Sequence, residues 1–298
     1  MGQLKQIEAF VGVATRGSLS AAAAAEGVTP AIMGRRLDAL EARLGVKLAV
    51  RTTRKLALTF EGQAFLEDCQ RILNDLANAE ASVSLGGVKA SGHLKISAPA
   101  GFGRRHVAPL VAQFLDANPE VSLSLDLTDR LVDLVNEGID CAVRVGELTD
   151  SSLVSIRLAE NRRVVVASPA YLAQHGIPAT LADLPSHNCL SLGQQRGWVF
   201  RDGAELVTIK VSGMLECNDG AVLHEWALAG KGLAWRSMWE VGEDLRSGAL
   251  VSVLDGCAAP PTGIYAVFPQ RRQMPLRVRL FIDHLKHIYS NPDYWGDA

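Results

Sequence analysis

The chain has 298 residues, 48% of them hydrophobic and 21% charged, which is the composition of an ordinary globular protein and a length typical of two or three domains. No apolar run is long enough to cross a bilayer, and the N-terminus lacks the basic start and apolar centre of a secretory signal. The five cysteines are odd in number and widely scattered, which favours reduced thiols over a disulfide framework. We therefore expect a soluble cytoplasmic protein with no membrane association.

The formal net charge of −2 is unevenly distributed along the chain. Residues 1–60 hold nine Lys or Arg and four Asp or Glu, a charge of +5, whereas the remainder holds 21 basic and 28 acidic residues, a charge of −7. A small basic module joined to a larger acidic one is typical of a protein that binds a polyanion through its basic part.

The N-terminal segment contains signals for three short helices. Apolar residues recur at helical spacing over 3–15, and Ser18 is placed to cap an alanine-rich second helix. Thr29 provides an N-cap for a third helix, and Pro30 occupies the first helical position, where a missing N–H costs nothing. This third helix is predicted to end near Leu44. Two short helices joined by a glycine-containing turn form a helix-turn-helix.

Paired cations mark the third predicted helix. Arg35 and Arg36 project away from its apolar side, and arginine binds phosphates or the paired acceptors of guanine in the major groove of DNA. The following segment, 47–59, alternates enough to form two short strands that make a wing. The basic side chains predicted to be exposed on this wing are Arg51, Arg54 and Lys55. A basic helix beside a basic wing favours double-stranded DNA as partner, and the alternative is a helical bundle with a solvated basic face.

The run "IEAFVGVATRGSLSAAA", followed by "LEARLGVKL" and "RTTRKLALTFEG", resembles the winged helix-turn-helix of LysR-type transcriptional regulators over nearly all of residues 3–62. The resemblance implies a recognition helix at about 30–41. The chain departs from the family pattern at Glu26, where a leucine is usual, and at Thr29-Pro30-Ala31, where many members carry Ser-Gln-Pro. The predicted DNA-binding residues are Ser18, Thr29, Pro30, Met33, Arg35, Arg36, Arg51, Arg54 and Lys55.

A long amphipathic helix is predicted from Thr59 or Glu61 to about Leu85, and the Gly/Ser-rich stretch 86–92 reads as a flexible linker. A helix that leaves a DNA module with an exposed apolar stripe usually pairs with its twin. The resemblance implies that this linker helix makes an antiparallel dimer contact. The alternative is a helix that packs on its own chain.

After Gly92 the pattern changes to strand–helix alternation, which indicates an α/β sheet with parallel strands. The predicted strands lie at 93–98, 121–129, 140–146 and 162–168, within 210–219 and 220–235, and at 263–269. The predicted helices lie within 99–119, at 130–139, at 169–175, within 220–235 and at 276–290.

This part resembles the effector-binding domain of the same family, which is similar to type 2 periplasmic binding proteins. The resemblance rests on "ISAPAGFGRRHVAPL" and "LVDLVNEGIDCAVRVGEL". It implies three parts: a winged helix-turn-helix at 1–60, a linker helix at 61–91 and a two-lobed α/β domain at 92–298. The first lobe is expected at about 92–162 plus 266–292 and the second at about 163–265, with crossing segments near 161–163 and 263–267.

Ligands of open α/β sheets bind beyond the carboxyl ends of the strands, so an effector is expected between the lobes. Free N–H groups at Gly101–Gly103, at a helix start, would suit a carboxylate or another small anion. The predicted effector-binding residues are Ser97, Pro99, Ala100, Phe102, Gly103, Thr128, Asp129, Trp198, Phe200, Asn218 and Asp219.

We find no G-x-S-x-G, P-loop or H-E-x-x-H motif, so we expect no enzyme, no catalytic residue, no metal site and no cofactor. The leading hypothesis is a sequence-specific DNA-binding regulator modulated by a small, preferably anionic effector. Self-association as dimer or tetramer and contact with RNA polymerase accompany this hypothesis. The two alternatives are a plain solute-binding protein and an enzyme built on the α/β module, which the missing signal peptide and the missing catalytic motifs disfavour.

Overall fold

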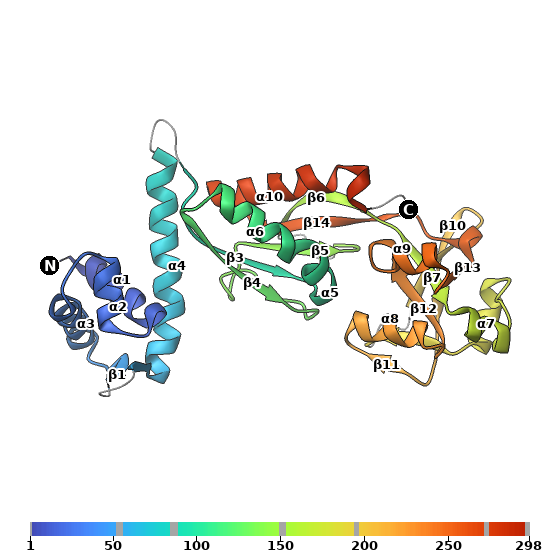
Figure 1. Cartoon of the computed structure of the whole chain (residues 1–298), viewed down its shortest axis with the longest axis horizontal. Helices are drawn as coiled ribbons and strands as arrows, with labels where there is room; N and C mark the ends of the chain where they lie inside the picture. Colours follow the sequence, from blue (N-terminus) through green and yellow to red (C-terminus); the bar gives the residue numbers. More distant parts are fainter. Residues whose placement is uncertain are drawn as a thin grey trace. The chain divides into compact units, whose positions relative to one another are not determined.

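The computed structural model describes residues 2–51, 56–83, 89–148, 153–193, 197–270 and 274–295. Internal contacts divide the chain into two units, Met1–Val88 and Lys89–Ala298 (Figure 1). No helix in these described ranges is long and apolar enough to span a membrane.

The first unit is helical with a two-stranded ribbon. Its elements are α1 (Gln3–Arg16), α2 (Leu19–Ala25), α3 (Pro30–Leu44), β1 (Ala49–Arg51), β2 (Leu56–Leu58) and α4 (Phe60–Val83). Phe10, Met33, Leu37 and Leu40 are fully buried where α1, α2 and α3 meet. The apolar spacing of these helices therefore closes a small core, and the predicted helix-turn-helix is confirmed.

The helix starts of this unit are capped as their sequences predict. The Ser18 hydroxyl accepts a hydrogen bond from the Ala21 N–H at 3.1 Å, and the Thr29 hydroxyl accepts one from the Ile32 N–H at 3.3 Å. Gly45 ends α3 with a φ of 73°, a left-handed conformation that glycine adopts without steric cost. Strands β1 and β2 then pair antiparallel, as expected for a wing.

The second unit has two lobes, each built on a five-stranded sheet (Figure 1). The strand order in the first lobe is β4-β3-β5-β14-β6, with β3 parallel to β4 and β5, and β14 antiparallel to β5 and β6. Helices α6 and α10 cover one face of this sheet, where Phe114 and Phe281 are buried. The elements of the first lobe are β3 (Gly92–Ala98), α5 (Ala100–Phe102), the π-helical turn η1 (Gly103–Val107), α6 (Ala108–Ala117), β4 (Val121–Leu127), β5 (Cys141–Val145), β6 (Leu153–Asn161), β14 (Thr262–Pro269), α10 (Leu276–Tyr289) and η4 (Pro292–Trp295).

The second lobe has the strand order β11-β8-β12-β7-β13, and a separate hairpin pairs β9 with β10. Its sheet lies between two apolar clusters, one around Trp198 and Leu233 and the other around Leu190 and Val241. The elements of the second lobe are β7 (Arg163–Ala167), α7 (Pro169–His175), η2 (Leu181–Ser186), β8 (Cys189–Leu192), β9 (Gly197–Asp202), β10 (Glu205–Lys210), β11 (Glu216–Cys217), α8 (Gly220–Leu228), β12 (Leu233–Ser237), α9 (Met238–Ser247), β13 (Val251–Val253) and η3 (Asp255–Cys257).

The chain passes between the sheets twice. It leaves the first sheet at the end of β6 and enters the second with β7 after the single residue Arg162, where the sequence predicts a crossing. It returns through 254–261, between β13 and β14. This return lies a few residues before the predicted 263–267, because the whole of β14 belongs to the first sheet.

Residues 130–139 correct a sequence prediction, because they form a series of turns and not a helix. The Asp133 carboxylate accepts hydrogen bonds from the N–H groups of Val135 (3.1 Å) and Asn136 (3.0 Å), which competes with helical hydrogen bonding. Gly138 has a φ of 63°, which also ends regular helix. The strand expected within 210–219 is shorter than predicted and comprises only Glu216 and Cys217.

Candidate nucleic-acid interface and effector site

The start of α3 presents polar groups on the surface of the first unit. Thr29 and Pro30 are exposed, and the Thr29 hydroxyl already accepts the Ile32 N–H. Arg35 is also exposed, on the second turn of the same helix. The helix start and an arginine are therefore available to a phosphate or a base edge.

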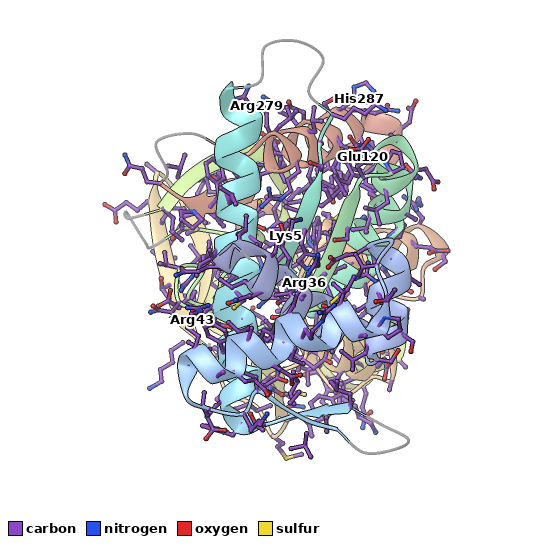
Figure 2. The ribbon with its side chains drawn as sticks, turned by 90° about the vertical axis from the view of Figure 1, so that its left-hand side faces the viewer. Lys5, Arg36, Arg43, Glu120, Arg279 and His287 are labelled. Carbon is purple, nitrogen blue, oxygen red and sulfur yellow. The ribbon has the colours of Figure 1, made fainter. Side chains whose placement is uncertain are left out.

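Arg36 differs from Arg35 because an acid already holds it. Its Nη1 lies 2.6 Å from Oε2 of Glu26, and only 14% of the Arg36 side chain and 28% of the Glu26 side chain are exposed. The pair joins the end of α2 to α3. Figure 2 shows Arg36 and Arg43 on the N-terminal unit, and the Arg43 Nε donates to the Gln6 side chain at 3.2 Å.

Met33 is fully buried between the helices of the first unit. Its side chain packs in the same cluster as Phe10 and Leu37. This position gives no support to the predicted contact of Met33 with DNA, because the residue does not reach the surface.

The wing is tied to α3 by a buried acid that the sequence analysis did not single out. Oε1 of Glu41 accepts the N–H groups of Leu48 (3.0 Å) and Ala49 (3.1 Å), and Oε2 accepts Lys47 Nζ (2.6 Å). Burial opposes ionisation of Glu41, but these hydrogen bonds outweigh it and lower the pKa of the carboxyl. The backbone of Arg51 lies in β1, whereas its side chain and residues Arg54 and Lys55 lie outside the described part of the structure.

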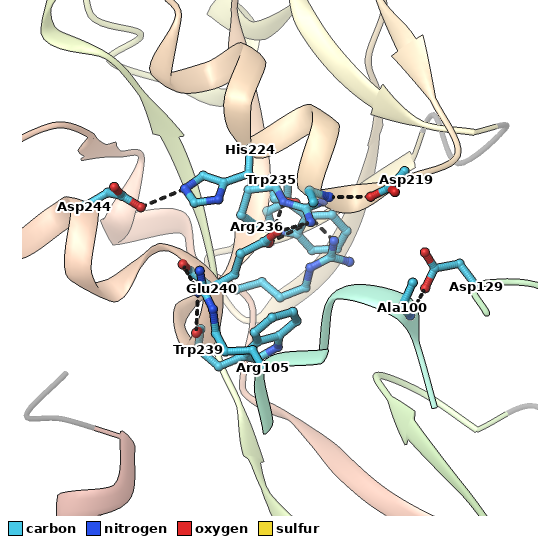
Figure 3. A network of polar contacts seen from close by, with 12 residues as sticks. Ala100, Arg105, Asp129, Asp219, His224, Trp235, Arg236, Trp239, Glu240 and Asp244 are labelled. Carbon is cyan, nitrogen blue, oxygen red and sulfur yellow. Dashed lines mark hydrogen bonds and ion pairs between the residues drawn. The ribbon is translucent and has the colours of Figure 1, made fainter. Parts of the chain in front are cut away.

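In the first lobe, the topology brings four predicted effector residues to one edge of the sheet. Ser97 lies near the end of β3, and Thr128 and Asp129 follow the parallel strand β4. Oδ1 of Asp129 accepts the N–H of Ala100 at 2.9 Å (Figure 3). The Ser97 hydroxyl is fully buried, and within the described residues it has no hydrogen-bond partner. At the helix start, where an anion is predicted to bind, the Asp129 carboxylate therefore already accepts one backbone N–H.

The neighbouring helix residues serve packing. Pro99 is the N-cap of α5, and Phe102 is fully buried against Trp239, with ring centroids 5.1 Å apart. A side chain at Gly103 would overlap the Leu127 side chain, so glycine lets the helix lie close to β4. Phe102 therefore belongs to a core, which does not support its predicted contact with an effector.

In the second lobe, the predicted residues separate into two groups. Trp198 and Phe200 are each 2% exposed and lie in the core, where Trp198 stacks on Trp235. They contribute apolar packing, and their positions do not support an effector contact. Asn218 is exposed, and Oδ1 of Asp219 accepts the Ala221 N–H at 2.8 Å as the cap of α8.

Three charged residues of the second lobe were not predicted from the sequence as part of a site. Arg236 donates to the Glu240 carboxylate through Nε (2.8 Å) and Nη2 (2.9 Å), and both side chains are buried (Figure 3). The Arg236 guanidinium also lies against Gly220, where a side chain would overlap it. The Arg163 guanidinium lies 3.6 Å from the centre of the Trp235 ring, and burial lowers the pKa of Arg163 to about 9. An arginine four residues before a glutamate was the only sequence signal for this pair.

Among the described residues, no group of three or more His, Cys, Asp or Glu is placed to hold a metal ion. The cysteines Cys69, Cys141, Cys189, Cys217 and Cys257 are all free thiols. Burial raises the pKa of Cys141 and Cys189 to about 12, which keeps both thiols protonated.

Comparisons with known proteins cover both units. Residues 4–63 match the family described as bacterial regulatory helix-turn-helix protein, lysR family, and residues 88–289 match the LysR substrate binding domain. The chain is 38% identical over 291 residues to the HTH-type transcriptional regulator DmlR of Escherichia coli (strain K12), covering 96% of this chain and 94% of DmlR. It is 36% identical over 280 residues to the HTH-type transcriptional activator TtdR of the same strain, covering 92% and 90%.

Solved structures agree with the family match. CrgA of Neisseria meningitidis, a LysR-type transcriptional regulator, aligns with a TM-score of 0.62 at 32% identity, covering 96% of this chain and 99% of CrgA. Full-length AphB of Vibrio cholerae, a virulence activator, aligns with a TM-score of 0.60 at 29% identity, covering 97% and 100%. Together with the basic helix-turn-helix and the two-lobed α/β domain, these matches establish that the chain belongs to the LysR family of transcriptional regulators.

Proposed function

We propose that this LysR-type regulator binds a specific double-stranded DNA sequence through α3 and the wing. The observation that carries the proposal is the capped start of α3, where exposed Thr29 and Pro30 precede exposed Arg35. A helix of this kind fits the major groove of DNA, and the wing, which Glu41 anchors, adds a second contact to the DNA backbone. We assign DNA binding to 1–60, dimerisation to the linker at 61–91 and effector binding to 92–298.

We further propose that a small molecule binds between the lobes and changes the affinity of the protein for its DNA. Ser97 lies near the carboxyl end of β3, Thr128 and Asp129 follow β4, and Asn218 and Asp219 follow β11 in the other lobe, and these positions support the proposed site. The effector is expected to be an anion. Because the Asp129 carboxylate holds the Ala100 N–H, an anion must compete with it. Cytoplasmic location, assembly as dimer or tetramer and contact with RNA polymerase belong to the same proposal.

Fluorescence anisotropy tests DNA binding directly. The purified protein is titrated with DNA from upstream of its own gene and with a scrambled duplex over a salt series. We expect preference for the upstream DNA and an affinity that falls steeply with salt. Arg35→Ala should weaken binding, whereas Arg246→Ala, the same charge change at an exposed site in the second unit, should leave it unchanged.

One outcome contradicts this proposal. Equal, loose binding to all duplexes from a genomic library would remove sequence specificity and favour a plain solute-binding protein or an enzyme. Deletion of residues 1–88 distinguishes a regulator from these two alternatives. A regulator without these residues loses DNA binding and still binds its ligand, whereas a solute-binding protein or an enzyme keeps its full function. The ligand itself is sought by thermal shift with panels of organic acids, sugars and amines, repeated with Asp129→Asn.

A further inference from the structure

One arginine of the first lobe forms hydrogen bonds with the second lobe. Arg105 lies in η1 of the first lobe, and its Nη1 donates to the backbone carbonyls of Glu240 (2.7 Å) and Trp239 (3.4 Å) in the second lobe (Figure 3). Both carbonyls belong to the first turn of α9. A guanidinium that bonds two successive carbonyls holds this helix end in a defined position, because hydrogen bonds from a charged donor are stronger than neutral ones.

The next residue adds a second contact to the same carbonyl. Nε2 of His106 lies 3.4 Å from the Trp239 oxygen, and the imidazole ring packs edge-on against the Trp239 indole with centroids 5.5 Å apart. The Phe102 ring also meets this indole edge-on. The side chain of Trp239 therefore inserts into an aromatic cluster of the first lobe, and its contact combines apolar packing with hydrogen bonds.

Aromatic residues of α10 and η4 hold His106 in place within the first lobe. The Tyr289 hydroxyl donates to the His106 carbonyl at 2.8 Å, and the Tyr294 hydroxyl lies 3.1 Å from Nδ1 of His106. Trp295 packs against the same imidazole. The turn that carries Arg105 and His106 is π-helical, a local departure from α-helix that is frequent at functional sites.

In the second lobe, the residues that accept Arg105 are connected to Asn218 and Asp219, which are predicted to bind the effector. Glu240 accepts Arg105 through its carbonyl and Arg236 through its carboxylate, and the Arg236 guanidinium lies against Gly220, next to Asp219. The N–H of Met238, which begins α9, donates to the carbonyl of Arg162 in the crossing segment at 2.9 Å. The first turn of α9 thus contacts the first lobe and the crossing directly, and it is linked to the start of α8 through Arg236.

We propose that Arg105, His106, Trp239 and Glu240 form an interlobe latch that sets the resting arrangement of the two lobes. The latch holds the lobes together through the Arg105–carbonyl bonds and the partly buried Trp239. A ligand at the Asn218–Asp219 edge displaces Arg236 relative to Glu240 and so alters the latch. This last step rests on the proposed effector site, whereas the latch itself does not. A ligand shifts the equilibrium only by as much as it distinguishes the latched from the released state.

Distances between spin labels on the two lobes test the latch in the full-length protein. Cysteines replace exposed Asp116 in α6 and exposed Lys210 in β10, and the partly exposed Cys217 and Cys257 are changed to serine. The buried Cys69, Cys141 and Cys189 stay, because labelling reagents do not reach them in the folded protein. Labelled chains are mixed with an excess of unlabelled ones so that distances within one chain dominate.

Arg105→Ala is compared with Arg104→Ala, an exposed arginine on the same turn. We expect one narrow distance distribution for the unmodified protein and for Arg104→Ala. For Arg105→Ala we expect a distribution at least twice as broad or a second population, and Arg105→Lys should restore part of the narrow form.

A distribution for folded Arg105→Ala that superposes on that of the unmodified protein would overturn the latch. If the alanine variant does not fold, as judged by circular dichroism, Arg105→Gln takes its place under the same criterion. The measurement uses neither DNA nor effector. A negative result in the anisotropy experiment would therefore contradict the proposed DNA binding and not the latch. A negative result in the distance measurement would contradict the latch and not the proposed DNA binding.

Discussion

Nη1 of Arg36 and Oε2 of Glu26 lie 2.6 Å apart, in an ion pair that joins α3 to the end of α2. Glu26 ends α2, so a charged contact joins the two helices at this point. The pair also makes the two neighbouring arginines, Arg35 and Arg36, electrostatically different. Arg35 is exposed and without this acid, whereas the charge of Arg36 is compensated within the protein.

The first prediction concerns this ion pair. Arg35→Ala should weaken DNA binding more than Arg36→Ala, because Arg35 is exposed and has no ion pair within the described residues, whereas Arg36 is paired with Glu26. Glu26→Gln should strengthen binding at low salt and steepen the salt dependence by about one released counterion, since Arg36 becomes free to meet a phosphate. Anisotropy over a salt series measures both effects, with Glu225→Gln in the second unit as control. Equal losses for the two arginine variants would show that Glu26 does not shield Arg36.

The second prediction concerns the anchor of the wing. Glu41→Ala leaves the buried N–H groups of Leu48 and Ala49 without their acceptor, and each such loss costs about 1–3 kcal/mol. Lys47→Ala removes only the partner whose side chain is 73% exposed, and should cost less than about 1 kcal/mol. Thermal unfolding of the first unit, followed by circular dichroism, compares the two. A larger effect for Lys47→Ala would mean that the ion pair, and not the backbone anchor, stabilises the wing.

The third prediction compares two glycines in helices. A side chain at Gly62 in α4 would overlap the carbonyl oxygen of Leu48, so Gly62→Ala must move the helix away from the wing and lower the unfolding temperature. Gly242 in α9 has open space around it, and Gly242→Ala should raise stability by about 0.5–1 kcal/mol through helix propensity. Calorimetry of both variants gives the comparison. A Gly62→Ala protein as stable as the parent would contradict the close approach of α4 to Leu48.

The fourth prediction concerns pH. Burial lowers the pKa of His106 from 6.5 to about 4, against the opposing hydrogen bond from the ring to the Trp239 carbonyl. Between these pH values the unfolded chain binds a proton at this residue and the folded protein does not. The contribution of His106 to stability is therefore full above pH 6.5 and decreases as the pH falls towards 4.

The experiment for this prediction is a comparison of unfolding temperatures for the parent protein and His106→Gln from pH 7 to pH 4. Carboxyl groups with lowered pKa values, such as Glu41 and Asp133, destabilise both proteins equally on acidification. The parent should lose more stability than the variant over this range. Parallel curves would show that His106 titrates in the folded protein as it does in the unfolded chain.

Local signals account for the part of the fold that sequence analysis predicted correctly. The caps at Ser18 and Thr29, and the helix beginning at Pro169 after Ser168, depend on atoms within three or four residues. Residues 130–139 have a helical apolar spacing, which predicts a helix, but Asp133 and Gly138 favour turns that bury Val132 and Leu134. There the side-chain hydrogen bonds of a tight turn outweighed periodicity.

The sequence by itself determined the helix-turn-helix and the alternation of strands and helices, since these depend on neighbouring residues. Its resemblance to the family supplied the place of the first crossing. Only the tertiary structure decided that Arg36 is paired with Glu26, that Trp198 lies in a core and that Arg105 reaches Glu240 in the other lobe. These contacts join residues far apart along the chain. No local pattern specifies which acid, carbonyl or apolar surface such a side chain meets, because that choice follows from the packing of whole elements.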